Sequence, residues 1–486
     1  MRPILTGLCA LALLPASAQW QAIGTPSITT SAGGDPDMLS VRRVWGDSIM
    51  DRLLLGGQFE WITHDGEPVL GMGQAKWDGT QWDSIATRIA PVAGTTLGFL
   101  RFQGRLYSYG EFVQMLDGGA HNKSIARLNE DNAVWEPLEC LNPDTGHYLR
   151  RLVNIAPSDT LYATGYRASV CGYPNNYVFA YDGSAFHEWP LCQLQGAADD
   201  RVFHVFTFQG IWYMTGHLIN SGQGFQEVRF IRYINGAWEV VPGWPSAWYG
   251  FIEDVSIHND TLYVCGEFSE QTGAPGNNIA YFDGTAWHAM GEGLGYPSDP
   301  MGIGAGRMRW YHGDLYVTGR YSHAGGEDRH GGLAWWNGEQ WCGFPSVFEG
   351  DVMPGTWPEV RDIAVWRDSL YICGSFKNLQ NQTVHQVAQW TGAPPDADCL
   401  FQGVAANDPK VPFCVHPNPS EGLVAWSGMP AGAERVRVCD VLGRAVLDLR
   451  QVPAQLDVGS FAPGTYAVTM LARDGMRLAM ARFVKR

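Results

Sequence analysis

Apolar and polar residues alternate along most of this chain with the two-residue period of β-strands, and one strand pattern recurs seven times. The copy over 262–268 reads LYVCGEF, an apolar run interrupted by a glycine. The shared glycines are Gly57, Gly110, Gly165, Gly216, Gly266, Gly319 and Gly374, which lie 53, 55, 51, 50, 53 and 55 residues apart. Because no helical period accompanies this repeat, its spacing predicts the blades of a β-propeller.

Each repeat contains four strand patterns. In the fifth repeat they cover 255–259, 261–268, 278–282 and 286–291. Both faces of the second strand are apolar, as in a sheet that packs between two neighbours. A glycine inside such a strand weakens it, so we expect a bulge or a close backbone approach at each shared glycine.

Tight hairpins are predicted between the third and fourth strands, where the sequence has dipeptides that favour positive φ angles. They are Asp78-Gly79, Asp182-Gly183, Asn235-Gly236, Asp283-Gly284 and Asn337-Gly338. A large aromatic residue follows in each case: Trp82, Phe186, Trp238, Trp287 and Trp341. Since large rings bury the most apolar area, we interpret these residues as packing between neighbouring blades.

The seventh repeat lacks a fourth strand, because prolines at 394 and 395 follow its third strand closely. The sequence WQAIG over 20–24 is similar to the fourth strand of the fifth repeat, WHAMG over 287–291, with Trp, Ala and Gly at the same positions. We therefore expect the N-terminal segment to form the outer strand of the last blade and to close the ring. The predicted fold is all-β: a seven-bladed β-propeller over 19–400, a linker over 401–410 and a small Ig-like β-sandwich over 411–486.

Residues 1–18 have the features of a secretory signal peptide: Arg2, an apolar stretch over 4–14, and small residues before a cleavage site after Ala18. No later segment has 18 continuous apolar residues, so no membrane span is expected. The formal net charge of −16 argues against nucleic acid as a partner.

Ten cysteines occur, one of them in the signal peptide. Cys265 and Cys373 occupy the same strand position in two repeats, and we expect both to be buried thiols. A disulfide from Cys171 to Cys140 or Cys192 is a further hypothesis. No spacing typical of a zinc site occurs, and neither a metal nor a cofactor is predicted.

The C-terminal segment has an ordered set of motifs: HPNPSEG over 416–422, VRVCDVLG over 436–443, Leu456-Asp457, GTY over 464–466 and FVKR over 483–486. This set resembles the type A sorting domain of the type IX secretion system. The matching residues are Pro417, Asn418, Pro419, Gly422, Asp440, Gly443, Gly464, Tyr466 and Lys485. The family often has an aromatic residue where this chain has His416.

The resemblance implies export by the signal peptide, followed by transport across the outer membrane by the type IX machinery. It also implies a secreted or outer-membrane-surface location in a Gram-negative bacterium. An ordinary adhesive sandwich domain is the alternative. The repeats, in turn, are similar to secreted, kelch-like propellers with an LYVGGxF pattern, a resemblance that implies an architecture and no activity.

The loops between second and third strands differ from repeat to repeat, and variable loops on a repeated scaffold are typical places for binding sites. Candidate ligand-binding residues in these loops and in those between blades are His64, Asp65, His121, Trp244, Trp248, Tyr249, His323, Glu327, Asp328 and His330. The densest polar cluster covers 323–330. Its histidines and carboxylates are metal-ligand types, but its glycines favour a flexible, solvated loop.

Sequence patterns of propeller enzymes are not met. Asp-Gly-Thr-x-Trp over 78–82 and 283–287 only approximates the SxDxGxTW box of sialidases, and no arginine triad for a carboxylated sugar can be picked out. The ligands of kelch-like copper oxidases are not found either. We therefore assign no catalytic residue, although carboxylates on separate blades leave no local pattern.

Asp followed by Ser or Thr and an aliphatic residue recurs, and it resembles the O-glycosylation sequon of bacteria with this export route. The acceptor residues would be Ser48, Ser84, Thr160, Thr261 and Ser369. The alternative is turn chemistry alone, because Asp-Ser and Asp-Thr are also favourable in turns.

Together these patterns predict an exported, non-catalytic binding or adhesion propeller whose partner is a glycan, peptide or surface component. The alternative function is an extracellular carbohydrate-active hydrolase with acidic residues at the mouth of the ring. A purely structural matrix protein is a third hypothesis.

Overall fold

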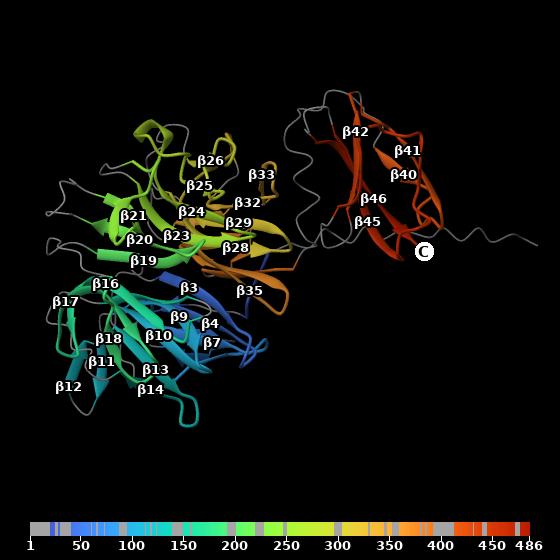
Figure 1. The fold of residues 1–486 in the computed structure, drawn as a ribbon. Coiled ribbons are helices and arrows are strands. Elements are labelled where there is room, and N and C mark those ends of the chain that lie inside the picture. Colours follow the sequence, from blue (N-terminus) through green and yellow to red (C-terminus); the bar gives the residue numbers. More distant parts are fainter. Residues whose placement is uncertain are drawn as a thin grey trace, which may run out of the picture. The chain divides into compact units, whose positions relative to one another are not determined.

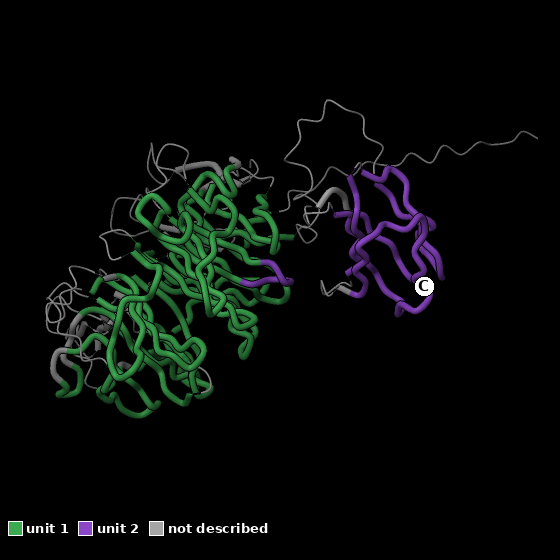
Figure 2. Tube along the Cα trace, turned by 45° about the horizontal axis from the view of Figure 1, so that its top comes forward, with its two compact units in different colours: residues 1–309, 315–394 green, residues 310–314, 395–486 purple. Residues whose placement is uncertain are grey.

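The computed structural model describes residues 20–24, 28–29, 40–59, 61–64, 67–71, 73–86, 95–111, 113–116, 119–122, 124–138, 149–155, 158–191, 201–218, 228–245, 250–295, 304–328, 331–344, 348–351, 359–379, 382–383, 386–391, 413–430, 432–439, 445–471 and 477–486. The chain divides into two compact units, shown in Figure 2. Unit 1 comprises 1–309 and 315–394, and unit 2 comprises 310–314 and 395–486.

Within the described part of unit 1, the strands form seven antiparallel groups of four, which we call blades 1 to 7. Blades 1 to 3 are β3 (Ser40–Asp47), β4 (Arg52–Gln58), β7 (Gln74–Trp77) and β8 (Trp82–Asp83); β9 (Thr95–Phe102), β10 (Arg105–Glu111), β13 (Ile125–Asn129) and β14 (Val134–Pro137); and β15 (Leu149–Asn154), β16 (Leu161–Val170), β17 (Tyr173–Tyr181) and β18 (Phe186–Glu188). Blades 4 and 5 are β19 (Arg201–Phe208), β20 (Ile211–Leu218), β21 (Val228–Ile234) and β22 (Ala237–Val240); and β23 (Phe251–His258), β24 (Thr261–Glu267), β25 (Ile279–Phe282) and β26 (Trp287–Ala289). Blades 6 and 7 are β28 (Ala305–Tyr311), β29 (Asp314–Gly319), β32 (Leu333–Trp336) and β33 (Trp341–Gly343); and β35 (Val360–Trp366), β36 (Ser369–Gly374), β39 (Val387–Trp390) and β1 (Trp20–Ala22). A single bridge between Tyr166 and Arg201 joins blades 3 and 4.

The inner strands of blades 1 to 7 are β3, β9, β15, β19, β23, β28 and β35. β3 contacts both β35 and β9. From β9 the contacts run in succession: β9 contacts β15, β15 contacts β19, and β19 contacts β23. Three hydrogen bonds continue this circuit through β28 and β35 back to β3: Met308 N to Asp254 Oδ2 at 2.9 Å, Arg309 Nε to Ile363 O at 3.4 Å, and Val44 N to Asp362 Oδ2 at 3.1 Å. In Figure 1, β3, β9, β19 and β23 accordingly lie in the middle of unit 1, whereas β12 (Gly119–Asn122), β14 and β26 lie at its rim. This is the β-propeller architecture that the repeat predicts, and the all-β class is confirmed.

The recurrent glycines face the backbone of the inner strand. An ideal Cβ on Gly266 would lie 1.9 Å from the carbonyl oxygen of Phe251, closer than any side chain is accommodated. The inner strand bulges at this point, with a register shift between Ile252 and Asp254. The equivalent distances at Gly110, Gly216 and Gly374 are 2.2, 2.1 and 2.0 Å. The predicted close backbone approach is confirmed at these four glycines.

The recurrent tryptophans link neighbouring blades through their indole N–H groups. Each donates to a carbonyl just beyond the outer strand of the preceding blade: Trp82 to Ile23 at 2.9 Å, Trp238 to Leu191 at 2.7 Å, Trp287 to Pro242 at 3.1 Å and Trp341 to Met290 at 2.6 Å. Packing between blades, the role predicted for them, is therefore confirmed, and a specific hydrogen bond accompanies it.

β1 supplies the outer strand of blade 7. Trp20 pairs with Trp390 and Gln21 with Gln389 in an antiparallel register. The Trp20 side chain is fully buried, and its ring centroid lies 5.0 Å from that of Trp390 and 5.2 Å from that of Phe344.

Between second and third strands, the structure has short hairpins where the sequence led us to expect irregular loops. They are β5 (Trp61–His64) with β6 (Glu67–Leu70), β11 (Val113–Leu116) with β12, β30 (His323–Ala324) with β31 (Glu327–Asp328), and β37 (Phe376–Leu379) with β38 (Gln382–Thr383). β2 (Ile28–Thr29), β27 (Leu294–Gly295) and β34 (Phe348–Asp351) add a third strand to three of them. In blade 5 the connection contains a 3-10 turn, Glu270–Thr272.

Unit 2 is a small β-sandwich. One sheet contains β40 (Cys414–His416), β41 (Leu423–Ser427) and β44 (Gln455–Asp457), and the other contains β43 (Ala445–Leu449), β42 (Arg435–Cys439), β45 (Gly464–Leu471) and β46 (Arg477–Lys485). Residues of both sheets share one buried core, including Val415, Val424, Val438, Leu456 and Phe483.

Cys265 and Cys373 are fully buried thiols, as predicted. Cys171 also holds a thiol, so the hypothesis of a disulfide from Cys171 is wrong. Cys342 on β33 is disulfide-bonded. Among the described residues, no helix has the length and apolar character needed to cross a membrane.

Candidate functional site

The candidate ligand-binding residues of the loops are not brought together in the described structure. Asp65, Trp248, Tyr249 and His330 lie outside the described residues. His64 and His121 lie on separate hairpins: His64 is the last residue of β5, and His121 is the second-last residue of β12. Across the described ranges, no group of three or more His, Cys, Asp or Glu residues is arranged to hold a metal ion.

Two further candidates have defined surroundings. Trp244 is 5% exposed and packs against Phe268 and Trp287, with ring centroids at 4.9 and 5.2 Å, so it belongs to the core rather than to an exposed loop. His323 pairs in register with Asp328, and Ala324 with Glu327, across a tight turn whose two glycines have φ angles of 62° and 79°. The expectation of a flexible loop is therefore wrong for 323–328, which form a hairpin.

The predicted sorting residues that the structure describes gather around the last strand of unit 2. Asn418, which lies between Pro417 and Pro419, donates from Nδ2 to the Arg482 carbonyl at 3.0 Å and accepts from the Val484 N–H at 2.9 Å. On the other edge of β46, Gly464 pairs with Lys485 and Tyr466 with Phe483.

Two more sorting residues have defined surroundings in unit 2. The Gly422 carbonyl accepts from the Val458 N–H at 2.7 Å, and Lys485 is only 7% exposed. Asp440 and Gly443 lie outside the described residues.

The potential glycosylation residues lie at or beside turns. Ser48 is exposed, whereas Ser84, Thr160, Thr261 and Ser369 are partly buried. In the first copy, the Asp47 side chain is buried and pairs with Arg52 and Arg101 at 3.1 and 2.7 Å, so it has a structural role of its own.

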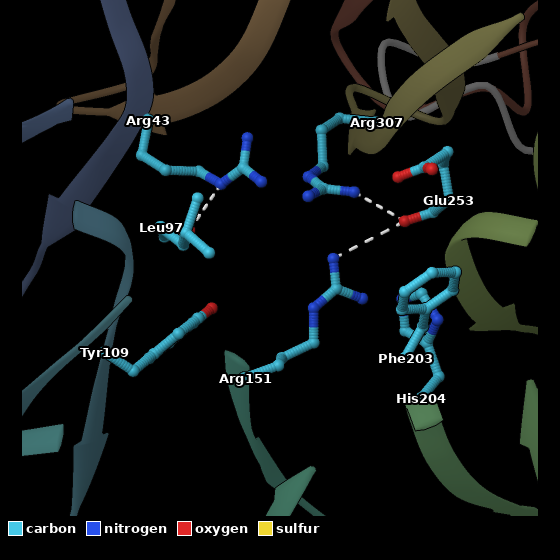
Figure 3. Close-up of a pocket in the computed structure, with 8 residues that line it drawn as sticks. All are labelled: Arg43, Leu97, Tyr109, Arg151, Phe203, His204, Glu253 and Arg307. Carbon is cyan, nitrogen blue, oxygen red and sulfur yellow. Dashed lines mark hydrogen bonds between the residues drawn. The ribbon is translucent and has the colours of Figure 1, made fainter. Parts of the chain in front are cut away.

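A pocket on the axis of unit 1 was missed by the sequence reasoning. It is lined by Arg43, Leu97, Tyr109, Arg151, Phe203, His204, Glu253 and Arg307 (Figure 3). Apart from Tyr109 on β10, these residues lie on six of the inner strands: β3, β9, β15, β19, β23 and β28. The pocket is partly open, and the empty space inside it amounts to about 420 Å³ when the open solvent at its mouth is included.

Three guanidinium groups converge in this pocket and donate to backbone carbonyls. Arg43 Nε donates to Leu97 O at 2.5 Å, whereas Arg307 Nη1 and Arg151 Nη2 donate to Glu253 O at 2.5 and 3.4 Å (Figure 3). None of the three forms an ion pair with a carboxylate of the described residues. The three arginines are 108 and 156 residues apart in the sequence, which explains why no triad could be picked out.

Two aspartates near the pocket accept hydrogen bonds from backbone groups of neighbouring inner strands. Asp254 and Asp362 accept the backbone N–H groups that link inner strands, as described above. Their charges outweigh burial at Arg307 and raise its pKa. At Arg43, burial and the charge of Arg307 lower the pKa to about 10. Burial and Arg307 also lower the pKa of Arg151. These two cations therefore remain charged at neutral pH in surroundings that disfavour their charge.

His204 is also part of the pocket lining. The side chain is 7% exposed, and its Nδ1 lies 2.9 Å from Thr215 Oγ1. Within the described part of the chain, its Nε2 has no hydrogen-bond partner; Asp254 Oδ1 is 3.9 Å away. Burial, together with Arg151 and Arg307, lowers the pKa of His204 well below its ordinary value, so the imidazole is neutral at pH 7.

A repeat signal could have identified this pocket. In five blades, the residue paired with the position before the shared glycine is ionisable: Arg43, Arg151, His204, Asp254 and Asp362 face Gly56, Thr164, Thr215, Cys265 and Cys373. Counting across the first hairpin from each glycine would have placed these residues at one level of the ring.

Three carboxyl groups on two blades influence one another, and one of them belongs to Glu253 of the pocket lining. Glu267 ends β24, and burial, followed by the charges of Glu253 and Glu359, raises the pKa of its carboxyl group. A carboxylic acid with a raised pKa beside other carboxylates is an arrangement found in acid–base catalysis.

No family model and no curated protein matches this chain. Among solved structures, it is similar to PorZ, a bacterial surface component of the type IX secretion system of Porphyromonas gingivalis, with 12% identity, 91% of this chain and 70% of that chain covered, and a TM-score of 0.35. The β-propeller domain of the Trilobed protease from Pyrococcus furiosus has 12% identity, 76% and 100% coverage, and a TM-score of 0.38. A fungal alcohol oxidase of the AA5 family in complex with copper has 11% identity, 96% and 99% coverage, and a TM-score of 0.38.

Proposed function

We propose that this protein is an exported, non-catalytic binding propeller that acts at the cell surface or outside a Gram-negative bacterium. The observation that carries the binding role is the axial pocket, where five inner strands place polar and charged side chains around one opening. A site assembled from many separate strands serves binding, because the rigid blades hold its side chains in fixed positions.

The same proposal includes delivery by the type IX secretion machinery. Its support is the arrangement of Asn418, Gly464, Tyr466 and Lys485 around β46, since these residues are far apart in the sequence and meet on one strand. If the export machinery recognises the folded domain, these four residues must lie close together on its surface.

Export is tested by expressing the full chain in a bacterium that has this secretion system. Asn418→Ala removes both hydrogen bonds to the last strand, and we expect the variant to accumulate in the periplasm. The matched control is Gln451→Ala, an exposed position of unit 2. Secretion of the Asn418 variant at the control level, with its fold verified by limited proteolysis, would argue against the sorting role.

Binding is tested with the full chain produced without residues 1–18, on a glycan array and on isolated cell-surface polysaccharide. We expect retention of a defined set of glycans without turnover. A chain that retains none of them would contradict the glycan form of the proposal.

A hydrolase that acts on carbohydrate is the second candidate, and the raised pKa of Glu267 is the observation that favours it. It predicts release of reducing sugar in a polysaccharide-hydrolysis panel and loss of that activity in Glu267→Gln. The binding proposal predicts no turnover by either protein.

A further inference from the structure

We infer that the axial pocket binds an oxyanion group, a carboxylate or a sulfate or phosphate ester, carried by a small ligand such as an acidic sugar. This inference rests on the proposed binding function and gives its site a chemical class. Three guanidinium groups from blades 1, 3 and 6 face one cavity, and guanidinium is the side chain best suited to oxyanion recognition.

The charge balance of the pocket supports an anionic ligand. Glu253 contributes its backbone carbonyl to Arg151 and Arg307, and Asp254 and Asp362 hold backbone N–H groups of the next blades. The carboxylates of Asp254 and Asp362 thus maintain the scaffold, and Glu253 is the one acidic residue of the lining, against three arginines. A guanidinium group has five N–H donors. In each of the three arginines, hydrogen bonds to described residues occupy only one or two of these donors, so the others remain for a ligand.

His204 is an independent observation that points to a ligand. His204 belongs to the pocket lining, and its Nε2 is buried and lacks a hydrogen-bond partner among the described residues. A buried polar atom left in this state is unfavourable unless something fills the site. In the tautomer that accepts from the Thr215 hydroxyl at Nδ1, the neutral ring carries its proton on Nε2 and can donate it to an oxyanion.

Tyr109 adds a third kind of donor, a hydroxyl group. Figure 3 shows its hydroxyl group directed towards the arginines from β10. The site therefore combines cationic and neutral donors from five blades around one cavity. The chain as a whole carries a formal net charge of −16, so an anion would be held by this local arrangement and not by the overall charge of the protein.

The inference is tested by isothermal titration calorimetry on the full chain without residues 1–18. The probes are glucuronate, glucose 6-sulfate, inorganic sulfate and, as the neutral match, glucose. We expect the anionic probes to bind and glucose not to bind. Tighter binding of the two sugars than of inorganic sulfate would assign the ligand to acidic sugars, whereas equal affinities would assign recognition to the oxyanion alone; both results support the inference.

Two variants test which residues are responsible. Arg151→Gln should weaken binding of the anionic probes about tenfold or more, because it removes a charge-assisted donor. Tyr109→Phe keeps the size of the side chain and should weaken binding severalfold. The control is Arg105→Gln, on β10 with Tyr109 but exposed and outside the pocket lining, which should leave affinity unchanged.

Three results would overturn the inference. They are glucose binding as tightly as glucuronate, anion binding that is unchanged in both pocket variants, and no binding of any anionic probe. In each case the glycan array decides separately on the proposed function: neutral glycans retained equally by the original chain and by Arg151→Gln would leave a binding propeller without an oxyanion site.

Discussion

At the scale of single residues, the fold depends on glycines that admit no side chain. Gly266→Ala would place a Cβ 1.9 Å from the Phe251 carbonyl oxygen, and backbone must move to relieve it. We expect a loss of about 2 kcal/mol or more in the free energy of unfolding. Gly306→Ala is the control in the same unit, because its nearest contact would be an ordinary 3.6 Å. Chemical denaturation followed by tryptophan fluorescence measures both, and equal losses would contradict the explanation of the repeat glycine.

The buried ion pairs of Asp47 predict a pH dependence of stability. Burial opposes ionisation of Asp47, but hydrogen bonds and charge from Arg101 and Arg52 outweigh it and lower its pKa below the ordinary 3.8. Because the folded-state pKa is the lower one, this stabilisation is fully present above pH 3.8 and is lost as the pH falls through the folded-state value.

We therefore expect Asp47→Asn to cost about 3 kcal/mol at pH 7 and progressively less below the ordinary carboxyl pKa. Unfolding free energies of both proteins at several pH values provide the test. Asp83→Asn, which breaks an exposed pair with Lys76, should change stability by no more than about 0.5 kcal/mol. A constant difference between the Asp47 variant and the original chain at all pH values would refute the assignment.

At the scale of elements, the junctions between blades depend on the recurrent tryptophans. Trp341→Phe retains an aromatic ring but leaves the Met290 carbonyl without the indole N–H that donates to it at 2.6 Å. We expect a loss of about 1–2 kcal/mol, since a buried acceptor loses its partner. Trp336→Phe on the adjacent strand β32 is the matched control, because within the described ranges no hydrogen bond of that indole links two blades. Thermal denaturation that ranks the control as the more damaging change would count against the proposed link.

The elements were predictable to different degrees for physical reasons. The strands of each blade, the hairpins after Asp-Gly or Asn-Gly and the tryptophans between blades follow from local patterns that recur in most copies. The small hairpins over 61–70 and 323–328 were expected to be loops, because two- to four-residue strands have too little alternation to be recognised. Their pairing is decided by backbone hydrogen bonds, which leave no mark in the sequence.

At the scale of the whole molecule, the pocket exists only because the inner strands return to their starting point. Arg43, Arg151 and Arg307 belong to three different repeats, and no local pattern relates them. Arg43 and Arg151 share a position, paired with the residue before the repeat glycine. This position lines a pocket only because the blades surround an axis. The sequence therefore predicts the scaffold well and the site poorly, because the scaffold is repeated and the site is made of the differences between repeats.

Closure by the N-terminal strand is the central claim, since an open ring would not hold the pocket together. The most direct measurement is disulfide formation in Gln21→Cys combined with Gln389→Cys, two positions paired across β1 and β39. Gln21→Cys combined with Gln340→Cys, which lies on blade 6, is the control. Peptide mapping under non-reducing conditions should find the crosslink in the first protein and not in the second. Absence of the 21–389 crosslink, or equal yields in both proteins, would contradict the closed ring.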